Sequence, residues 1–111
     1  MSQLVIRVSN SENAVIYLEP PASEGYVIGR SDEASSYVPD IDLVHYDARE
    51  KGVSRRHSAL VRFQGAACVV DLNSVNGTFV DGKRLAPDTP HPIGRSCNLT
   101  LGTLSFTISN V

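Results

Sequence analysis

The sequence lacks the long apolar runs that a membrane-spanning segment needs, and it has no basic region followed by an apolar signal segment near its start. Of its 111 residues, 41% are hydrophobic and 20% are charged, which is ordinary for a folded domain and unlike a disordered chain. We therefore expect no membrane insertion, a cytoplasmic location and a single domain over residues 1–111.

Cysteine and histidine are also scarce, which leaves little support for a metal site or a disulfide framework. The two cysteines, Cys68 and Cys97, lie in strand-like stretches without a second cysteine or a histidine at metal-ligand spacing. We interpret both as small core residues, with a disulfide as the less favoured alternative because disulfides are uncommon in the cytosol. The three histidines are scattered along the chain. The sequence thus predicts no metal and no cofactor.

An excess of positive charge is absent as well. The chain has 10 Lys and Arg against 12 Asp and Glu, for a formal net charge of −2. Because nucleic-acid binding depends on a concentration of basic charge, we expect no nucleic-acid partner. Any anion that the protein binds must be held by a local group of residues.

No segment shows a sustained helical repeat. Apolar side chains instead recur with a period of two, most clearly in Leu104, Phe106 and Ile108, which is the pattern of half-buried strands. Gly, Pro, Asn and Asp separate the strand-like runs, so the pattern predicts an all-β antiparallel sandwich or barrel. The strands that we expect cover residues 4–8, 15–18, 26–30, 41–43, 58–64, 68–72, 78–80, 83–85, 99–101 and 104–109.

Two features of the turns and loops stand out. Asp81-Gly82 lies between strand-like residues and tolerates positive φ, so it should close a tight hairpin. The one long irregular stretch runs from residue 31 to residue 52 and is interrupted by Pro39. We expect it to form an exposed loop around the short strand at residues 41–43, and loops of this length in small domains are usually either functional or flexible.

Three polar clusters lie at strand ends or turns: Gly29-Arg30, residues 54–57 (Ser-Arg-Arg-His) and residues 74–78 (Ser-Val-Asn-Gly-Thr). Two arginines, a hydroxyl group and glycine-permitted turns are the components of a phosphate site, although a Gly-Arg step alone would favour a surface arginine at the end of a strand. The nearby Ser and His could also suggest a hydrolase, but the chain has no G-x-S-x-G motif and no evident orienting acid. We expect a binding protein and not an enzyme.

The clusters occur in the order and spacing of the forkhead-associated (FHA) domain, which the chain resembles over about residues 4–108. The matching segments are YVIGR at 26–30, GVSRRHS at 52–58 and DLNSVNGTFVDG at 71–82. This resemblance implies a two-sheet antiparallel β-sandwich of about eleven short strands with functional loops at one end. It also implies a signalling module that recognises phosphothreonine in proteins phosphorylated by Ser/Thr kinases.

The resemblance assigns ligand contacts to four residues. Arg30 matches the arginine that bonds the phosphate, Ser54 matches its hydroxyl donor, and Arg55 matches a second donor. Asn76 matches the asparagine whose amide binds the peptide backbone beside the phosphothreonine. We expect the side chains of Arg30 and Ser54 to face solvent in the free protein.

Other motif residues are given structural or peripheral roles by the resemblance. Gly29 is a packing residue, Gly77 serves the turn that orients Asn76, and the His57 ring bonds within its loop and holds Ser54 in place. Arg56 is equally well interpreted as a peripheral contact or as an ordinary solvated arginine. Val75 stands where some family members have Thr or Ser as an additional phosphate contact.

The segment from residue 31 to residue 52 resembles a variant seen in bacterial members of the family, which suggests a bacterial protein. Its length could shape peptide preference. The alternative function that remains open is an FHA-like interaction module that binds its partner independently of phosphate.

Overall fold

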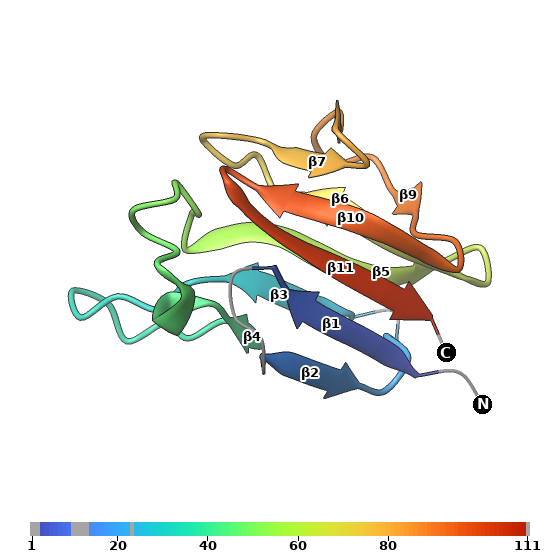
Figure 1. Ribbon diagram of the computed structural model, residues 1–111, viewed down its shortest axis with the longest axis horizontal. Coiled ribbons are helices and arrows are strands. Elements are labelled where there is room, and N and C mark those ends of the chain that lie inside the picture. Colours follow the sequence, from blue (N-terminus) through green and yellow to red (C-terminus); the bar gives the residue numbers. More distant parts are fainter. Residues whose placement is uncertain (1–2, 10–13, 23, 111) are drawn as a thin grey trace.

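Eleven strands form two stacked sheets in the computed structural model, which describes residues 3–9, 14–22 and 24–110 (Figure 1). One sheet has six strands, in the order β2 (Val15–Leu18), β1 (Leu4–Val8), β11 (Leu104–Asn110), β10 (Ser96–Leu101), β7 (Thr78–Val80) and β8 (Lys83–Arg84). The other sheet has five, in the order β4 (Ile41–Asp42), β3 (Tyr26–Gly29), β5 (Arg56–Phe63), β6 (Ala66–Asp71) and β9 (His91–Pro92). The expected all-β sandwich is confirmed.

Helical structure among the described residues is limited to one 3-10 turn, η1 (Val44–Tyr46). None of the described helical segments is long and apolar enough to cross a membrane.

The hydrophobic core lies between the two sheets and follows from the period-two pattern. In β11 the side chains of Leu104, Phe106 and Ile108 are completely or almost completely buried, and the residues between them are partly exposed. From the opposite sheet, Leu60 of β5 and Val69 of β6 belong to the same cluster of buried apolar residues. Because burial of one such side chain stabilises the fold by about 1.5–3 kcal/mol, this alternation fixes which face of each strand turns inward.

The expected strands are all present, with differences at their ends. β10 begins at Ser96, three residues before the expected start, and β6 begins at Ala66 and ends at Asp71. The short edge strand β9 (His91–Pro92) was missed, because a proline within two residues argues against a strand unless it lies at a sheet edge. The expected hairpin is confirmed, since β7 and β8 pair through Asp81 and Gly82, both with positive φ.

The segment from residue 31 to residue 52 is only partly the exposed loop that we expected. β4 lies in it and pairs with β3 in parallel, so the five-stranded sheet is mixed and not wholly antiparallel. Ile41, Leu43 and Ala48 are buried in the core. The second half of the segment therefore packs against the sandwich, while residues 31–38 include the more exposed part.

Both cysteines are buried and free, as the core interpretation predicted. Burial, with a contribution from the carboxylate of Asp81, raises the pKa of the Cys97 thiol to about 11. Burial also raises the pKa of the Cys68 thiol. Both side chains therefore act as small apolar residues at neutral pH.

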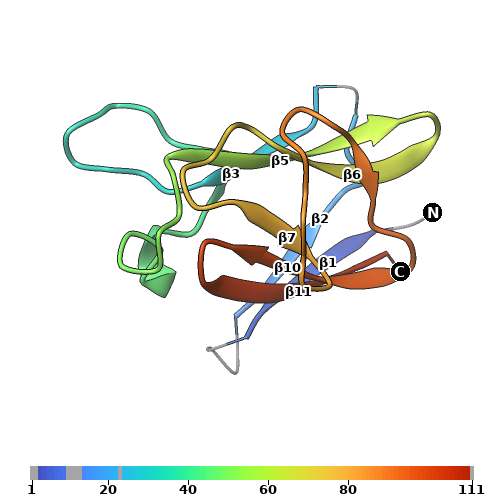
Figure 2. The same ribbon diagram turned by 90° about the horizontal axis from the view of Figure 1, so that it is seen from above.

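The irregular segments gather at one end of the sandwich. In Figures 1 and 2 the loops after β3, before β5 and between β6 and β7 project at the left, and the labelled ends of the chain lie at the right. The sandwich thus holds three loops of distant sequence beside one another, as the resemblance implied.

A backbone irregularity at the end of β3 positions the first of these loops. The register between β3 and β5 shifts between Ile28 and Gly29. A Cβ atom on Gly29 would lie 1.9 Å from the carbonyl oxygen of Arg55, which is far inside van der Waals contact. Only glycine permits this approach, through which the backbone N–H of Arg30 donates to the same Arg55 oxygen at 3.2 Å.

We predict that Gly29→Ala lowers the free energy of unfolding by about 3 kcal/mol, because the added methyl group forces β3 and β5 apart. Gly94→Ala is a suitable control, since a Cβ there meets nothing within 4 Å and the positive φ alone should cost about 1 kcal/mol. Chemical denaturation of both variants measures the difference. Equal losses would contradict the packing role given to Gly29.

Candidate functional site

The three loops surround an open hollow of about 330 Å³. The loop after β3 covers residues 30–40, the loop before β5 covers 47–55, and the loop between β6 and β7 covers 72–77. The hollow is lined by Arg30, Arg49, Gly52, Val53, Ser54, Val75 and Asn76. The structure thus brings together three of the four residues expected to contact a ligand, and Arg55 lies beside them in the adjoining hollow.

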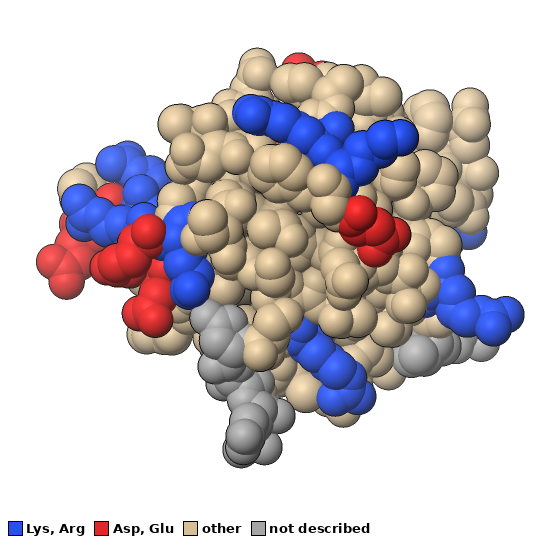
Figure 3. All heavy atoms as spheres, turned by 45° about the horizontal axis from the view of Figure 1, so that its top comes forward, with Lys and Arg blue, Asp and Glu red and all other residues tan. Residues whose placement is uncertain are grey.

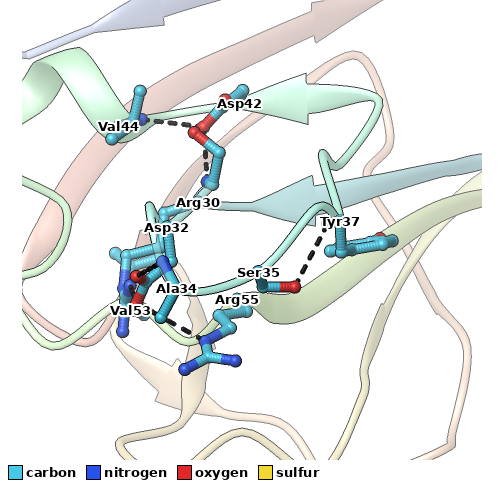
Figure 4. Close-up of polar contacts among 10 residues, drawn as sticks. Arg30, Asp32, Ala34, Ser35, Tyr37, Asp42, Val44, Val53 and Arg55 are labelled. Carbon is cyan, nitrogen blue, oxygen red and sulfur yellow. Dashed lines mark hydrogen bonds and ion pairs between the residues drawn. The ribbon is translucent and has the colours of Figure 1, made fainter.

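Arg30 is held more firmly than expected. Its Nε donates to the carbonyl oxygen of Val53 at 2.7 Å, and its terminal nitrogen pairs with the carboxylate of Asp32 at 3.2 Å (Figure 4). Only 17% of the side chain is exposed, so the expectation that it faces solvent was wrong. The reason is that the guanidinium group bonds to Val53 and Asp32 in the free protein. Only its remaining N–H groups are presented to the hollow.

The backbone around Arg30 is fixed from the other side by Asp42 of β4. Its carboxylate accepts the N–H groups of Ser31 at 2.9 Å and Val44 at 3.1 Å (Figure 4). The N–H of Leu43 donates to the carbonyl oxygen of Gly29 at 2.8 Å. The sequence analysis did not assign Asp42 a role, although alternation with the buried Ile41 and Leu43 indicates a side chain that points away from the core.

Ser54 connects the second and third loops. Its Oγ accepts the backbone N–H of Val75 at 3.3 Å, which leaves the hydroxyl hydrogen free to donate to an anion in the hollow. Its own backbone N–H donates to Nδ1 of His57 at 3.0 Å. The half-buried serine is therefore oriented by bonds on both its side chain and its backbone.

His57 has the architectural geometry that the resemblance implied. Because Nδ1 accepts from Ser54, Nε2 carries the hydrogen and donates to the carbonyl oxygen of Gly77 at 2.7 Å. The ring is completely buried. Burial lowers the pKa of His57 below its usual 6.5, although the bond to Gly77 and the charge of Asp71 act in the opposite direction.

The loop before β5 fixes the orientation of the Asn76 side chain. Its Nδ2 donates to the carbonyl oxygen of Gly52 at 2.9 Å, so its Oδ1 and the second amide hydrogen are available to a ligand. A Cβ on Gly52 would lie 2.6 Å from this nitrogen, and the φ of Gly52 is +82°. The positive φ favours glycine at position 52, and a Cβ there would displace the Asn76 amide from this bond, a role that was not predicted from the sequence although the residue is part of the matching motif.

Asp71, at the end of β6, organises the third loop. Its Oδ1 accepts the hydroxyl groups of Ser74 and Thr78, each at 2.6 Å. The Ser74 hydroxyl oxygen in turn accepts the N–H of Gly77 at 3.0 Å, and Ser58 bonds to Thr78 at 2.7 Å. Asp71 is buried, and these bonds satisfy a charge that would otherwise be costly to cover.

The remaining predicted positions behave differently from one another. Arg55 is about half exposed and lies 3.6 Å from the carboxylate of Asp32. Arg56 is exposed, its guanidinium carbon lies 5.7 Å from the centre of the Tyr37 ring, and it is not among the residues that line either hollow. Val75 is 82% exposed at the edge of the hollow and offers an apolar side chain there.

Two charged residues near the hollow carried no signal in the sequence. Asp32 contacts both Arg30 and Arg55, and Arg49 lines both the hollow and its neighbour. Figure 3 shows that basic and acidic side chains are interleaved at this end of the molecule. Arg30 and Asp32 lie only two residues apart, but the approach of Arg55 and Arg49 to them depends on loops that are distant in sequence, so no local motif revealed the cluster.

The model of the FHA domain family matches residues 26–102, a span that contains Arg30, Ser54, Arg55 and Asn76. The chain belongs to the FHA domain family. FHA domains are protein-interaction modules and not catalytic ones.

Relatives of known sequence or structure agree with this assignment. The chain is 36% identical over 66 residues to the protein phosphatase 1 regulatory inhibitor subunit PPP1R8 homolog of Arabidopsis thaliana, which covers 59% of the chain and 15% of that relative. A solved structure described as an analysis of phosphothreonine-dependent FHA domain interactions is 20% identical, with a TM-score of 0.71 over 96% of this chain and 95% of that one.

A second solved structure is the FhaA FHA domain complexed with the intracellular domain of Rv3910. It is 21% identical to this chain, with a TM-score of 0.69 over 95% of this chain and 98% of that one. The two structural similarities show that the FHA sandwich extends over nearly the whole chain.

We predict that the free energy of unfolding decreases as the pH falls below about 6.5, the usual pKa of histidine. In this range the unfolded chain binds a proton at His57 and the folded protein does not, because folding lowers the pKa of His57. The slope contributed by this one proton reaches at most about 1.4 kcal/mol per pH unit. Denaturation curves between about pH 7.5 and 5.5, the range in which histidines usually titrate, measure this pH dependence of the free energy of unfolding.

His57→Gln should remove this part of the pH dependence and lower stability at neutral pH, since the bonds to Ser54 and Gly77 are disturbed. His91→Gln, on the half-exposed strand β9, is the matched control and should retain the dependence. An unchanged pH profile in His57→Gln would exclude the buried neutral ring as its cause.

Proposed function

We propose that this FHA domain binds phosphothreonine in proteins that Ser/Thr kinases have phosphorylated, and that it acts as a signalling adaptor and not as an enzyme. The observation that carries the proposal is that Arg30, Ser54 and Asn76, from three different loops, line one hollow, with Arg55 in the hollow that adjoins it. Residues 4–108 would form the functional domain.

The donors around the hollow suit a phosphate group. A phosphorylated side chain brings a charge of about −1.5 to −2 and three acceptor oxygens. The free N–H groups of Arg30, the hydroxyl of Ser54 and the half-exposed guanidinium of Arg55 can donate to these oxygens. A fixed guanidinium is better suited to this task than a lysine, because its planar donors match the geometry of the oxyanion.

Asn76 supplies the contact that makes a peptide, and not a free phosphate, the proposed ligand. Its Oδ1 and one amide hydrogen are available at the rim of the hollow, while the other hydrogen anchors it to Gly52. A carboxamide can accept a peptide N–H and donate to a peptide carbonyl at the same time. Asn76 would thus set the register of the peptide relative to the phosphate.

The relatives support a protein partner. One of the similar structures comes from an analysis of phosphothreonine-dependent FHA domain interactions. Another contains an FHA domain bound to the intracellular domain of a second protein. We infer the same class of partner for this chain. The chain spans about 15% of the plant relative, whose other activities do not carry over. A bacterial source and a cytoplasmic location stay predictions from the sequence.

We predict that the domain binds a phosphothreonine peptide and has little affinity for the same peptide without phosphate. Ser54→Ala and Arg30→Lys should each weaken binding by about 1.5–3 kcal/mol, because each removes a charge-assisted bond or the guanidinium fork. Arg30→Lys is preferable to Arg30→Ala, since it retains the charge beside Asp32. Isothermal titration calorimetry measures the affinities.

Arg7→Lys is the control for these variants, because Arg7 is an exposed residue in the middle of β1 and lies outside the loops. It should bind as the parent does. Equal binding of phosphorylated and unphosphorylated peptides by the parent would favour the alternative, an interaction module that does not depend on phosphate.

We further predict that phosphothreonine binds more tightly than phosphoserine in an otherwise identical peptide, and that glutamate binds far more weakly than either. Burial of the additional methyl group contributes about 0.8 kcal/mol, and the β-branched side chain has less rotamer freedom to lose. Glutamate brings one charge and two oxygens instead of the phosphate dianion. Fluorescence anisotropy with three labelled peptides tests the order, and equal affinities for phosphothreonine and phosphoserine would exclude a methyl pocket.

A further inference from the structure

A carboxylate already occupies the space between the two arginines of the proposed phosphate site. One oxygen of Asp32 lies 3.2 Å from the terminal nitrogen of Arg30 and 3.6 Å from Nε of Arg55 (Figure 4). The Asp32 side chain is 13% exposed. It therefore faces the arginines where a ligand oxyanion would approach them, and it lines the hollow that adjoins the site.

Asp32 is fixed in this place by its own loop. Its other oxygen accepts the backbone N–H of Ala34 at 2.8 Å, which closes a local turn (Figure 4). The bond from Ala34, together with the bond from Arg30 and the charge of Arg55, lowers the pKa of Asp32 below its usual 3.8. The side chain is thus a charged acceptor at neutral pH.

Arg30 has other bonds that keep it in position. Its Nε donates to Val53, and its backbone N–H donates to Arg55. The next residue, Ser31, is held by Asp42 of β4. Since these three bonds do not involve Asp32, the guanidinium should stay at the hollow when the Asp32 carboxylate is removed. The main effect of Asp32 on this site is therefore its charge and its occupation of donors.

We propose that Asp32 is an internal competitor of the ligand phosphate: its carboxylate occupies a donor of Arg30 and pairs with Arg55 in the free protein and thereby lowers the affinity of the site. The proposal rests on the proposed function. Arg30, Asp32 and Arg55 together carry a charge of +1, where the two arginines alone would carry +2. A phosphate must share or replace the contacts of Asp32 and is repelled by its carboxylate, so Asp32 keeps binding weaker than the donor set alone would allow.

The test compares the parent with Asp32→Asn, which removes the charge but retains an oxygen for the N–H of Ala34. A second variant, Asp32→Ser, also retains an acceptor for this turn. Glu33→Gln is the matched control, because Glu33 lines the same hollow and changes the net charge equally, but makes neither of the ion pairs found among the described residues. Each protein is titrated with one phosphothreonine peptide and its unphosphorylated form, and its thermal unfolding is recorded.

We expect both Asp32 variants to bind the phosphopeptide roughly fivefold to tenfold more tightly than the parent, an effect in the range of partly screened charge pairs. Glu33→Gln should stay within about twofold of the parent, because its exposed charge is screened by solvent. The gain should also decrease as salt is added.

Three results would overturn the proposal. Weaker binding by folded Asp32 variants would show that Asp32 positions the arginines for the ligand. Equal tightening by Glu33→Gln would show a general charge effect. Unchanged affinity in the Asp32 variants, with a parent that requires phosphate, would reject the competitor and leave the proposed function intact. If neither the parent nor the variants distinguish the phosphorylated peptide, the proposed function fails as well.

Discussion

One buried imidazole joins the loops on which the site depends. His57 accepts the backbone N–H of Ser54 and donates to the carbonyl oxygen of Gly77, which lies 20 residues further along the chain. Only a neutral ring with both nitrogens bonded can do this, and complete burial favours that neutral form. The second and third loops are therefore tied at a fixed separation, which in turn places Ser54 beside Val75 and Asn76 beside Gly52.

Two glycines and the carboxylate of Asp71 support the loops around this bridge. Gly29 allows β3 and β5 to approach, and Gly52 allows Asn76 to reach a carbonyl oxygen. Asp71 orders the third loop by accepting two hydroxyl groups from Ser74 and Thr78. Gly29 and Asp71 do not line the hollow, yet each fixes a loop that does. The short motifs of the sequence combine such supporting residues with the contact residues.

The sequence predicted the strands well and placed the expected contact residues on loops, because both follow from local patterns. The alternation in β11 fixed its buried face, and the motif order placed Arg30, Ser54 and Asn76 at loops that do meet. The parallel pairing of β3 with β4 and the role of Asp32 could not be predicted. The pairing of β3 with β4 and the contact of Asp32 with Arg55 arise between segments more than ten residues apart, on which spacing along the chain gives no information, whereas Asp32 and Arg30 lie only two residues apart.

The free protein already uses part of the bonding capacity of three of the four proposed contact residues. Arg30 bonds to Val53, Ser54 to Val75, and Asn76 to Gly52. Each bond fixes a rotamer and leaves other donors or acceptors of the same side chain available. Immobilising a flexible side chain on binding costs about 0.5–1.5 kcal/mol of binding free energy. Because these three side chains are already ordered, this cost is small for them. Arg55, about half exposed, is the exception: its Nε lies 3.6 Å from the Asp32 carboxylate, beyond hydrogen-bonding distance, so its side chain has more freedom to lose when a ligand binds.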